Sequence, residues 1–172
     1  MRALVCFLIS FSAFAQSAAV LEKKIQEDPD NIAARVKLAE VRLNEGQYAK
    51  AAELLNSYTD QLNSAGFRAL AFAYSSLKKY DDEVRVLSII AKKEEDNHEW
   101  HMLLGQAYIK QAAAFINSDQ EKNQRLLTQG IQQLRQTLKL QPKYKPAFDL
   151  LLKTFIAQKA NNEARELLQS IK

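Results

Sequence analysis

The chain has 172 residues and a net charge of +4, with 47% hydrophobic and 26% charged residues. This balance is typical of a globular domain of ordinary size, and so small a net charge does not point to nucleic-acid binding. Only 4 glycines and 3 prolines are present, which favours long helices over many short strands.

The first residues have the pattern of an export signal. Arg2 precedes an uncharged apolar run from Ala3 to Ala15, which ends in the small-x-small letters AFA. We therefore expect cleavage after Ala15, with a signal peptide over residues 1–15 and one domain over residues 16–172. An uncleaved N-terminal anchor is the alternative, although about 20 apolar residues are needed to span a bilayer.

Cys6 is the only cysteine, and it lies within the predicted signal. A mature chain that starts at Gln16 has no cysteine, so it can form neither a disulfide nor a thiolate metal site. An exported helical protein without disulfides fits a bacterial periplasm better than a disulfide-rich extracellular setting. We therefore expect a periplasmic location.

Hydrophobic periodicity predicts helices along the whole mature chain. A leading helix near Ala18–Glu27 is followed by four helix pairs. Their expected ranges are Asn31–Asn44 with Tyr48–Gln61, Ala65–Leu77 with Tyr80–Lys93, Asn97–Asn117 with Gln120–Leu140, and Pro146–Lys159 with Asn161–Ile171. The third pair is the longest, and its tip should project beyond the others, either as a second contact surface or as a tolerated insertion.

A helix–turn–helix pattern recurs along the chain, first in the stretch LAEVRLNEGQYAKAAELL. Small residues stand where two helices should cross closely, at Ala39, Ala71 and Gly105. The turns are expected at Gly46 and at Asn161–Asn162. One such hairpin cannot bury its apolar face alone, so consecutive hairpins must stack into a continuous core.

This set of motifs resembles the tetratricopeptide repeat, whose unit is about 34 residues. The segments WHMLLGQAY, NEGQYAKAAELL and KLQPKYKPAF match the family's Trp, Leu-Gly, Tyr, Ala and Pro positions. Two positions depart from the family, which has a small residue at the place of Glu83 and a turn glycine at the place of Lys78. The resemblance implies an all-α solenoid, a right-handed superhelical array of about four repeats plus the leading helix.

In this family the first helix of each pair lines a concave groove that binds a partner. Carried over place by place, the resemblance implies a groove made of Glu40, Leu43, Asn44, Arg68, Phe72, Met102, Gln106, Ile109, Lys110, Lys153 and Ile156. Such a surface, apolar with scattered charges, is typical of a receptor for a peptide or a helix. The alternative is that several of these residues pack against the leading helix.

Two expectations about substitutions follow from this assignment. Gly105→Leu should collapse the third helix pair, because the large side chain would stand where two backbones meet. Charge reversal at both Arg68 and Lys110 should weaken partner binding and leave the fold intact.

No constellation of residues points to catalysis. His98 and His101 could share a helix face, but no cysteine completes a site, so we expect no metal. Glycine loops for phosphates and a hydrolase nucleophile motif are missing from the sequence. We therefore expect neither enzyme activity nor a cofactor.

The sequence thus favours an interaction module of the cell envelope, a scaffold or adaptor that holds a protein, peptide or helix. Peripheral contact with a membrane complex is compatible with this role, whereas a nucleic-acid partner is not expected. Three alternatives stay open: a self-assembling structural protein, a membrane-tethered assembly factor and a small metal-binding protein.

Overall fold

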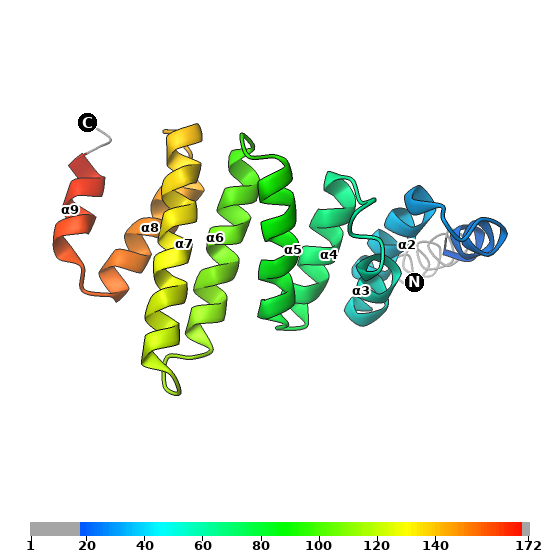
Figure 1. Ribbon diagram of the computed structural model, residues 1–172, viewed down its shortest axis with the longest axis horizontal. Helices are drawn as coiled ribbons and strands as arrows, with labels where there is room; N and C mark the ends of the chain where they lie inside the picture. Colours follow the sequence, from blue (N-terminus) through cyan, green and yellow to red (C-terminus); the bar gives the residue numbers. More distant parts are fainter. Residues whose placement is uncertain (1–17, 170–172) are drawn as a thin grey trace, which may run out of the picture. The chain divides into compact units, whose positions relative to one another are not determined.

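The computed structural model describes residues 18–169, and these residues form helices joined by turns, with no strand among them. The prediction of an all-helical chain is therefore confirmed. The chain consists of two compact units, which meet in the sequence between Lys79 and Tyr80. The predicted signal peptide, residues 1–15, lies outside the described residues. Figure 1 shows the helices coloured in chain order.

Between residue 18 and Lys79, the first unit contains four helices. They are the leading helix over residues 18–27, α2 (Ile32–Asn44), α3 (Tyr48–Asn56) and α4 (Ser64–Ser76). Helix α2 contacts both α3 and α4, and α3 contacts α4, as in two consecutive hairpins that share their packing faces. The small residues Ala39 and Ala71 are 0% and 6% exposed, which fits their predicted place at helix crossings.

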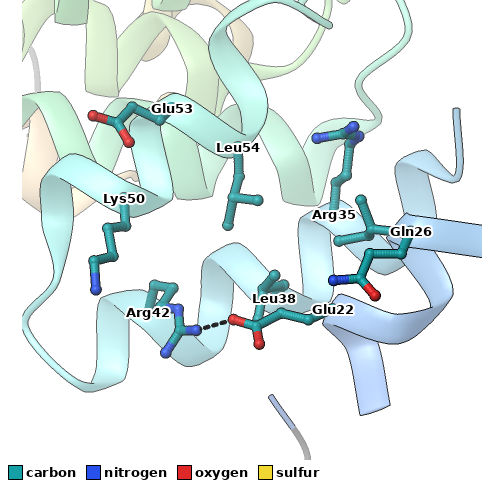
Figure 2. Close-up of a pocket in the computed structure, with 9 residues that line it drawn as sticks. Glu22, Gln26, Arg35, Leu38, Arg42, Lys50, Glu53 and Leu54 are labelled. Atoms are coloured by element: carbon teal, nitrogen blue, oxygen red, sulfur yellow. Dashed lines mark hydrogen bonds and ion pairs between the residues drawn. The ribbon is translucent and has the colours of Figure 1, made fainter. Parts of the chain in front are cut away.

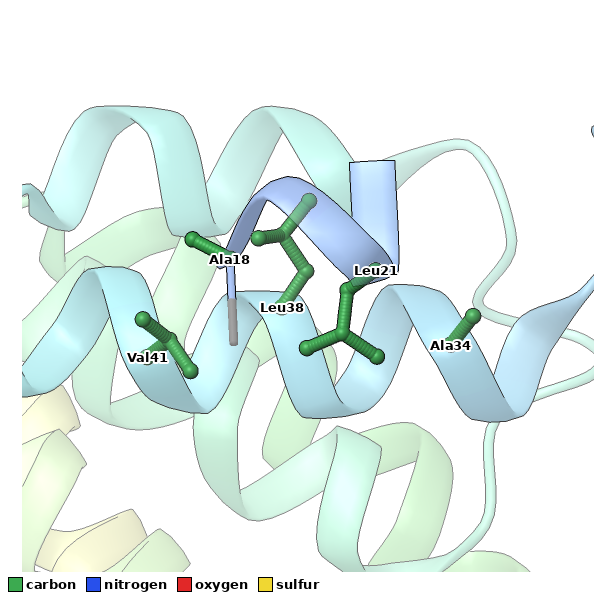
Figure 3. Packing of buried hydrophobic residues seen from close by; sticks show 5 residues of the cluster. All are labelled: Ala18, Leu21, Ala34, Leu38 and Val41. Carbon is green, nitrogen blue, oxygen red and sulfur yellow. The ribbon is translucent and has the colours of Figure 1, made fainter. Parts of the chain in front are cut away.

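The leading helix packs on one face of α2. Ala18 and Leu21 lie against Ala34, Leu38 and Val41 of α2 (Figure 3). The spacing of these α2 residues, four and then three positions apart, places them on one face of the helix. Since burial of a leucine side chain contributes about 1.5–3 kcal/mol, the leading helix is an integral part of the first unit's core.

The described part of the second unit, up to residue 169, contains five helices. They are α5 (Tyr80–Lys93), α6 (His98–Ala113), α7 (Gln120–Leu140), α8 (Lys145–Ala157) and α9 (Asn161–Gln169). Each helix contacts the next one along the chain. A buried cluster of Leu134, Ala147, Leu151, Phe155 and Ala164 joins α7, α8 and α9.

Polar side chains cap the N-termini of several helices. The side chains of Asn31, Asn63, Asn97 and Asp119 each accept a hydrogen bond from a backbone N–H in the first turn, at 2.8–3.1 Å. Such caps satisfy backbone donors that have no partner within the helix.

Three helices end in the same left-handed turn. Gly46, Lys78 and Lys159 have φ of 72°, 56° and 57°. The next N–H in each turn bonds to a carbonyl five residues back, at 2.8–2.9 Å. Lys78 thus takes the conformation of the family's glycine. The turn expected at Asn161–Asn162 was wrong by two residues, because Lys159 makes the reversal and Asn161 already starts α9.

Helices α3 and α6 end well before their predicted last residues. Helix α3 ends at Asn56 instead of Gln61, and α6 ends at Ala113 instead of Asn117. After each end the N–H groups bond three residues back instead of four, as in Tyr58 N–H to Leu55 O at 3.0 Å and Phe115 N–H to Ala112 O at 2.9 Å. These tighter turns redirect the chain.

Helix α7 has 21 residues as predicted, which corresponds to about 31 Å. Within the second unit, the joined ends of α6 and α7 reach beyond α5 and α8 in Figure 1. The expectation of a projecting third hairpin therefore holds within this unit.

Candidate functional site

In the first unit, the predicted groove residues lie on α2 and α4 and reach the surface. Phe72 is 55% exposed, and its ring makes an edge contact with Tyr48 at a centroid distance of 6.1 Å. Arg68, one turn before Phe72, is exposed. On α2, Glu40 and Asn44 are exposed and Leu43 is half-buried.

The described leading helix does not cover these positions. Its contacts with α2 go to the face of Ala34, Leu38 and Val41 (Figure 3), whereas Glu40 and Asn44 remain exposed. The alternative in which groove residues of α2 pack against residues 18–27 is therefore not supported at these two positions.

In the second unit, the predicted groove residues differ in their surroundings. Ile156 on α8 is 61% exposed, and Lys153 and Gln106 are also exposed. Met102 and Ile109 on α6 are half-buried against the core cluster of α7 and α8. These two residues therefore contribute to packing within the unit as well as to its surface.

Lys110 has a structural role that the sequence did not indicate. Its ammonium lies 2.8 Å from Glu83 Oε1, and the side chain of Glu83 is only 5% exposed. The next residue, Gln111, donates through Nε2 to Asp81 Oδ1. These contacts tie α5 to α6. The expectation that reversal of Lys110 leaves the fold intact is therefore wrong, because it would place a second carboxylate against buried Glu83.

A pocket of about 530 Å³ opens between the leading helix, α2 and α3 (Figure 2). Its apolar lining comes from Ile25, Leu38 and Leu54, and its charged lining includes Arg42 and Glu22, which form an ion pair. The hydrogen bond to Glu45 raises the pKa of Arg42 above its ordinary value. Desolvation by burial opposes this rise, and the negative charges of Glu45 and Glu22 add to it.

Arg35 also lines this pocket, and contacts within the first unit hold its side chain. Its guanidinium lies 4.3 Å from the centroid of the Tyr58 ring, and Nε donates to the Pro29 carbonyl at 2.9 Å. Both arginines of this pocket, Arg35 and Arg42, are therefore held by contacts with neighbouring groups.

A second pocket, of about 420 Å³, lies between α6, the first half of α7 and α8. Two predicted groove residues, Ile109 and Lys153, belong to its lining. Ile116, beyond the end of α6, also lines it and is 60% exposed. Sequence reasoning missed this pocket, since it requires side chains from three helices.

The two histidines serve packing between helices. His101 Nδ1 lies 2.8 Å from Gln133 Oε1 on α7, and Nε2 lies 2.8 Å from the Glu95 carbonyl oxygen. His98 makes an edge contact with the Tyr144 ring at a centroid distance of 4.8 Å. No group of three or more His, Cys, Asp or Glu residues within 18–169 is arranged to hold a metal ion.

None of the helices described between residues 18 and 169 is both long enough and apolar enough to cross a bilayer.

Comparison with known proteins agrees with this architecture. Residues 8–71 match the family model described as tetratricopeptide repeat. The match begins within the segment that the sequence analysis assigns to the export signal. No curated protein matches the chain.

Solved structures are similar to this chain over most of its length. A crystal structure of MamA matches 94% of this chain and 88% of its own, with a TM-score of 0.74 and 14% identity. Another MamA structure gives 0.75 and 15%, over 94% of this chain and 82% of its own. The described residues thus have the fold of a tetratricopeptide-repeat solenoid.

A third similar structure is much longer than this repeat protein. A human IFIT1 dimer with PPP-AAAA matches 87% of the chain with a TM-score of 0.66 and 21% identity. The chain spans 34% of that IFIT1 chain. At these identities the structural matches show the fold alone.

Proposed function

We propose that the protein is an exported interaction module of the cell envelope. It binds a protein, peptide or helix through the exposed faces of the first helices of its pairs, α2 and α4 in one unit and α6 and α8 in the other. Tetratricopeptide repeats generally mediate protein interactions, and this is the role that the fold suggests.

The exposure of large apolar side chains at the predicted groove positions carries the proposal. Phe72 is 55% exposed and Ile156 is 61% exposed. Each lies about one helical turn from an exposed cation, Arg68 or Lys153 respectively. An apolar anchor beside a positive charge is suited to a partner segment with apolar and acidic residues.

Export is a proposal that rests on residues 1–15. Cleavage after Ala15 leaves the leading helix in the mature protein, so the first unit keeps its core contacts at Ala18 and Leu21. The mass of the native N-terminus tests this: we expect it to start at Gln16, whereas a chain that retains residues 1–15 would indicate an anchored form.

Retention of a partner from envelope extract tests the binding role. The mature chain is immobilised beside a Phe72→Ser/Ile156→Ser variant and a control variant, Leu168→Ser, which removes another exposed apolar side chain (45% exposed) from α9. We expect a protein that the parent and the control retain and the double variant loses.

Two results would contradict this proposal. Equal retention by all three chains would place the interface elsewhere. Retention of the protein itself alone would favour the self-assembling alternative.

A further inference from the structure

The long third hairpin builds an apolar wall beside α8. Helix α7 has 21 residues, against 9 in α3 and 14 in α5. Its first half and the residues after α6 form one side of the 420 Å³ pocket, and α8 forms the other. The apolar lining comes from Ile109, Ala113, Ile116, Leu127, Leu150 and Ala157.

Internal contacts hold the wall in place. Asn123 is buried and its amide donates to the Ala112 carbonyl at 2.7 Å, which joins α7 to the end of α6. The Lys122 ammonium lies 3.8 Å from the centroid of the Phe115 ring. Asp119 caps α7 through the Lys122 N–H at 2.8 Å. A pocket that is organised before binding loses less conformational entropy when it is filled.

The chemistry of the lining selects an apolar occupant. The two buried polar side chains of the pocket already donate to backbone carbonyls, Asn123 to Ala112 and Thr154 to Leu150 at 2.8 Å. The other uncharged polar residues of the lining are glutamines. A volume of about 420 Å³ lies in the range of small binding pockets, about 300–1,000 Å³, and can take apolar side chains presented by a helix.

The positive charge of Lys153 favours a partner with a negative charge at this place. Lys153 is the only charged residue in this lining, it is exposed, and it makes no ion pair within residues 18–169. From residue 110 to the end of the chain, Lys and Arg also outnumber Asp and Glu. Charge complementarity therefore calls for a carboxylate next to the apolar anchors.

We propose that the pocket between α6, α7 and α8 receives an amphipathic helix of a partner protein, whose apolar side chains fill it and whose Asp or Glu pairs with Lys153. This deepens the proposed function, on which it rests, because it assigns a partner chemistry to the binding surface of the second unit. It also gives the elongated hairpin a role as the wall of a specificity pocket.

Selection from a display library of random 16-residue peptides on the full mature chain tests the proposal. We expect the enriched peptides to carry apolar residues at helical spacing and at least one acidic residue. Their affinity should fall about tenfold for Lys153→Gln and for Ala157→Trp, which fills the pocket from an exposed position. Lys139→Gln, an exposed lysine of α7 outside the lining, is the matched control.

Reciprocal charge exchange gives the sharpest outcome. A selected peptide with its acidic residue changed to Lys should bind Lys153→Glu better than it binds the parent. Loss of binding in Phe72→Ser with no effect of the pocket variants would overturn the pocket proposal and leave the binding function standing. Enrichment of basic peptides, or binding only between copies of the chain, would also overturn it. Binding of neither peptide nor envelope protein would contradict both proposals.

Discussion

Gly105 of α6 and Gly130 of α7 face each other where the two helices cross. A methyl group on Gly105 would lie 3.1 Å from the Gly130 carbonyl oxygen, and one on Gly130 would lie 3.0 Å from the Gly105 carbonyl oxygen. The longest pair of helices in the described chain thus depends on the absence of two side chains at one point.

Substitution of either glycine should destabilise the protein. Gly105→Ala and Gly130→Ala each force the helices apart, at about 1–3 kcal/mol of unfolding free energy, and Gly105→Leu should be worse because Leu134 also lies 3.0 Å from the new Cβ. The double alanine variant should lose less than the sum of the single losses, since the first methyl already separates the helices. Chemical denaturation measures all four variants, and a Gly105→Leu protein as stable as the parent would contradict the crossing.

The Glu83–Lys110 pair should matter for stability. Lys110→Met leaves a buried carboxylate without its cation, which typically costs about 3–5 kcal/mol, and Lys110→Glu should be at least as harmful. The double variant Glu83→Leu/Lys110→Met should recover much of the loss. Thermal unfolding compares the set, and equal melting temperatures for the parent and Lys110→Met would show that the ion pair contributes little.

Lys78 offers a stabilising substitution. Its φ of 56° is a left-handed conformation, which costs most residues about 1–2 kcal/mol relative to glycine. Part of the gain is offset by glycine's greater freedom in the unfolded chain. We expect Lys78→Gly to be more stable than Lys78→Ala by about 0.5–1 kcal/mol. The alanine variant also lacks the lysine side chain and is therefore the control; the reverse order would rule out strain at this turn.

The leading helix should stabilise the first unit. Leu21→Ala removes a side chain that is 9% exposed and packs on α2, at about 2 kcal/mol. Val20→Ala, at a position that is 55% exposed, should cost much less. Denaturant titration of both variants would show equal losses if the helix were not docked on α2.

Local chemistry explains which parts of the fold could be predicted from the sequence. The helices follow from apolar periodicity, and the crossing at Gly105 follows from the need for a small residue. The ends of α3 and α6 could not be predicted in this way, because the apolar periodicity continues past them. Beyond each end, backbone N–H groups bond to carbonyls three residues back instead of four.

Contacts between distant positions explain what the sequence did not reveal. Glu83 and Lys110 are 27 residues apart, and although Glu83 replaces the family's small residue, nothing in the sequence pairs it with Lys110. Gly130 stands within a glutamine-rich helix, where nothing nearby indicates the backbone of α6. The pocket beside α8 depends on where the ends of three helices meet, and this is set by the turn after Ala113.

Site-specific photo-crosslinking in the native cells tests the central claim, that the faces of the first helices bind a partner, most directly. A photoreactive aromatic residue is placed at Phe72 or Ile156, and at the exposed control positions Ala49 of α3 and Lys92 of α5. We expect adducts with the same envelope protein from Phe72 and Ile156 and none from the control positions. Adducts from Ala49 or Lys92 alone, or equal labelling at all four positions, would contradict it.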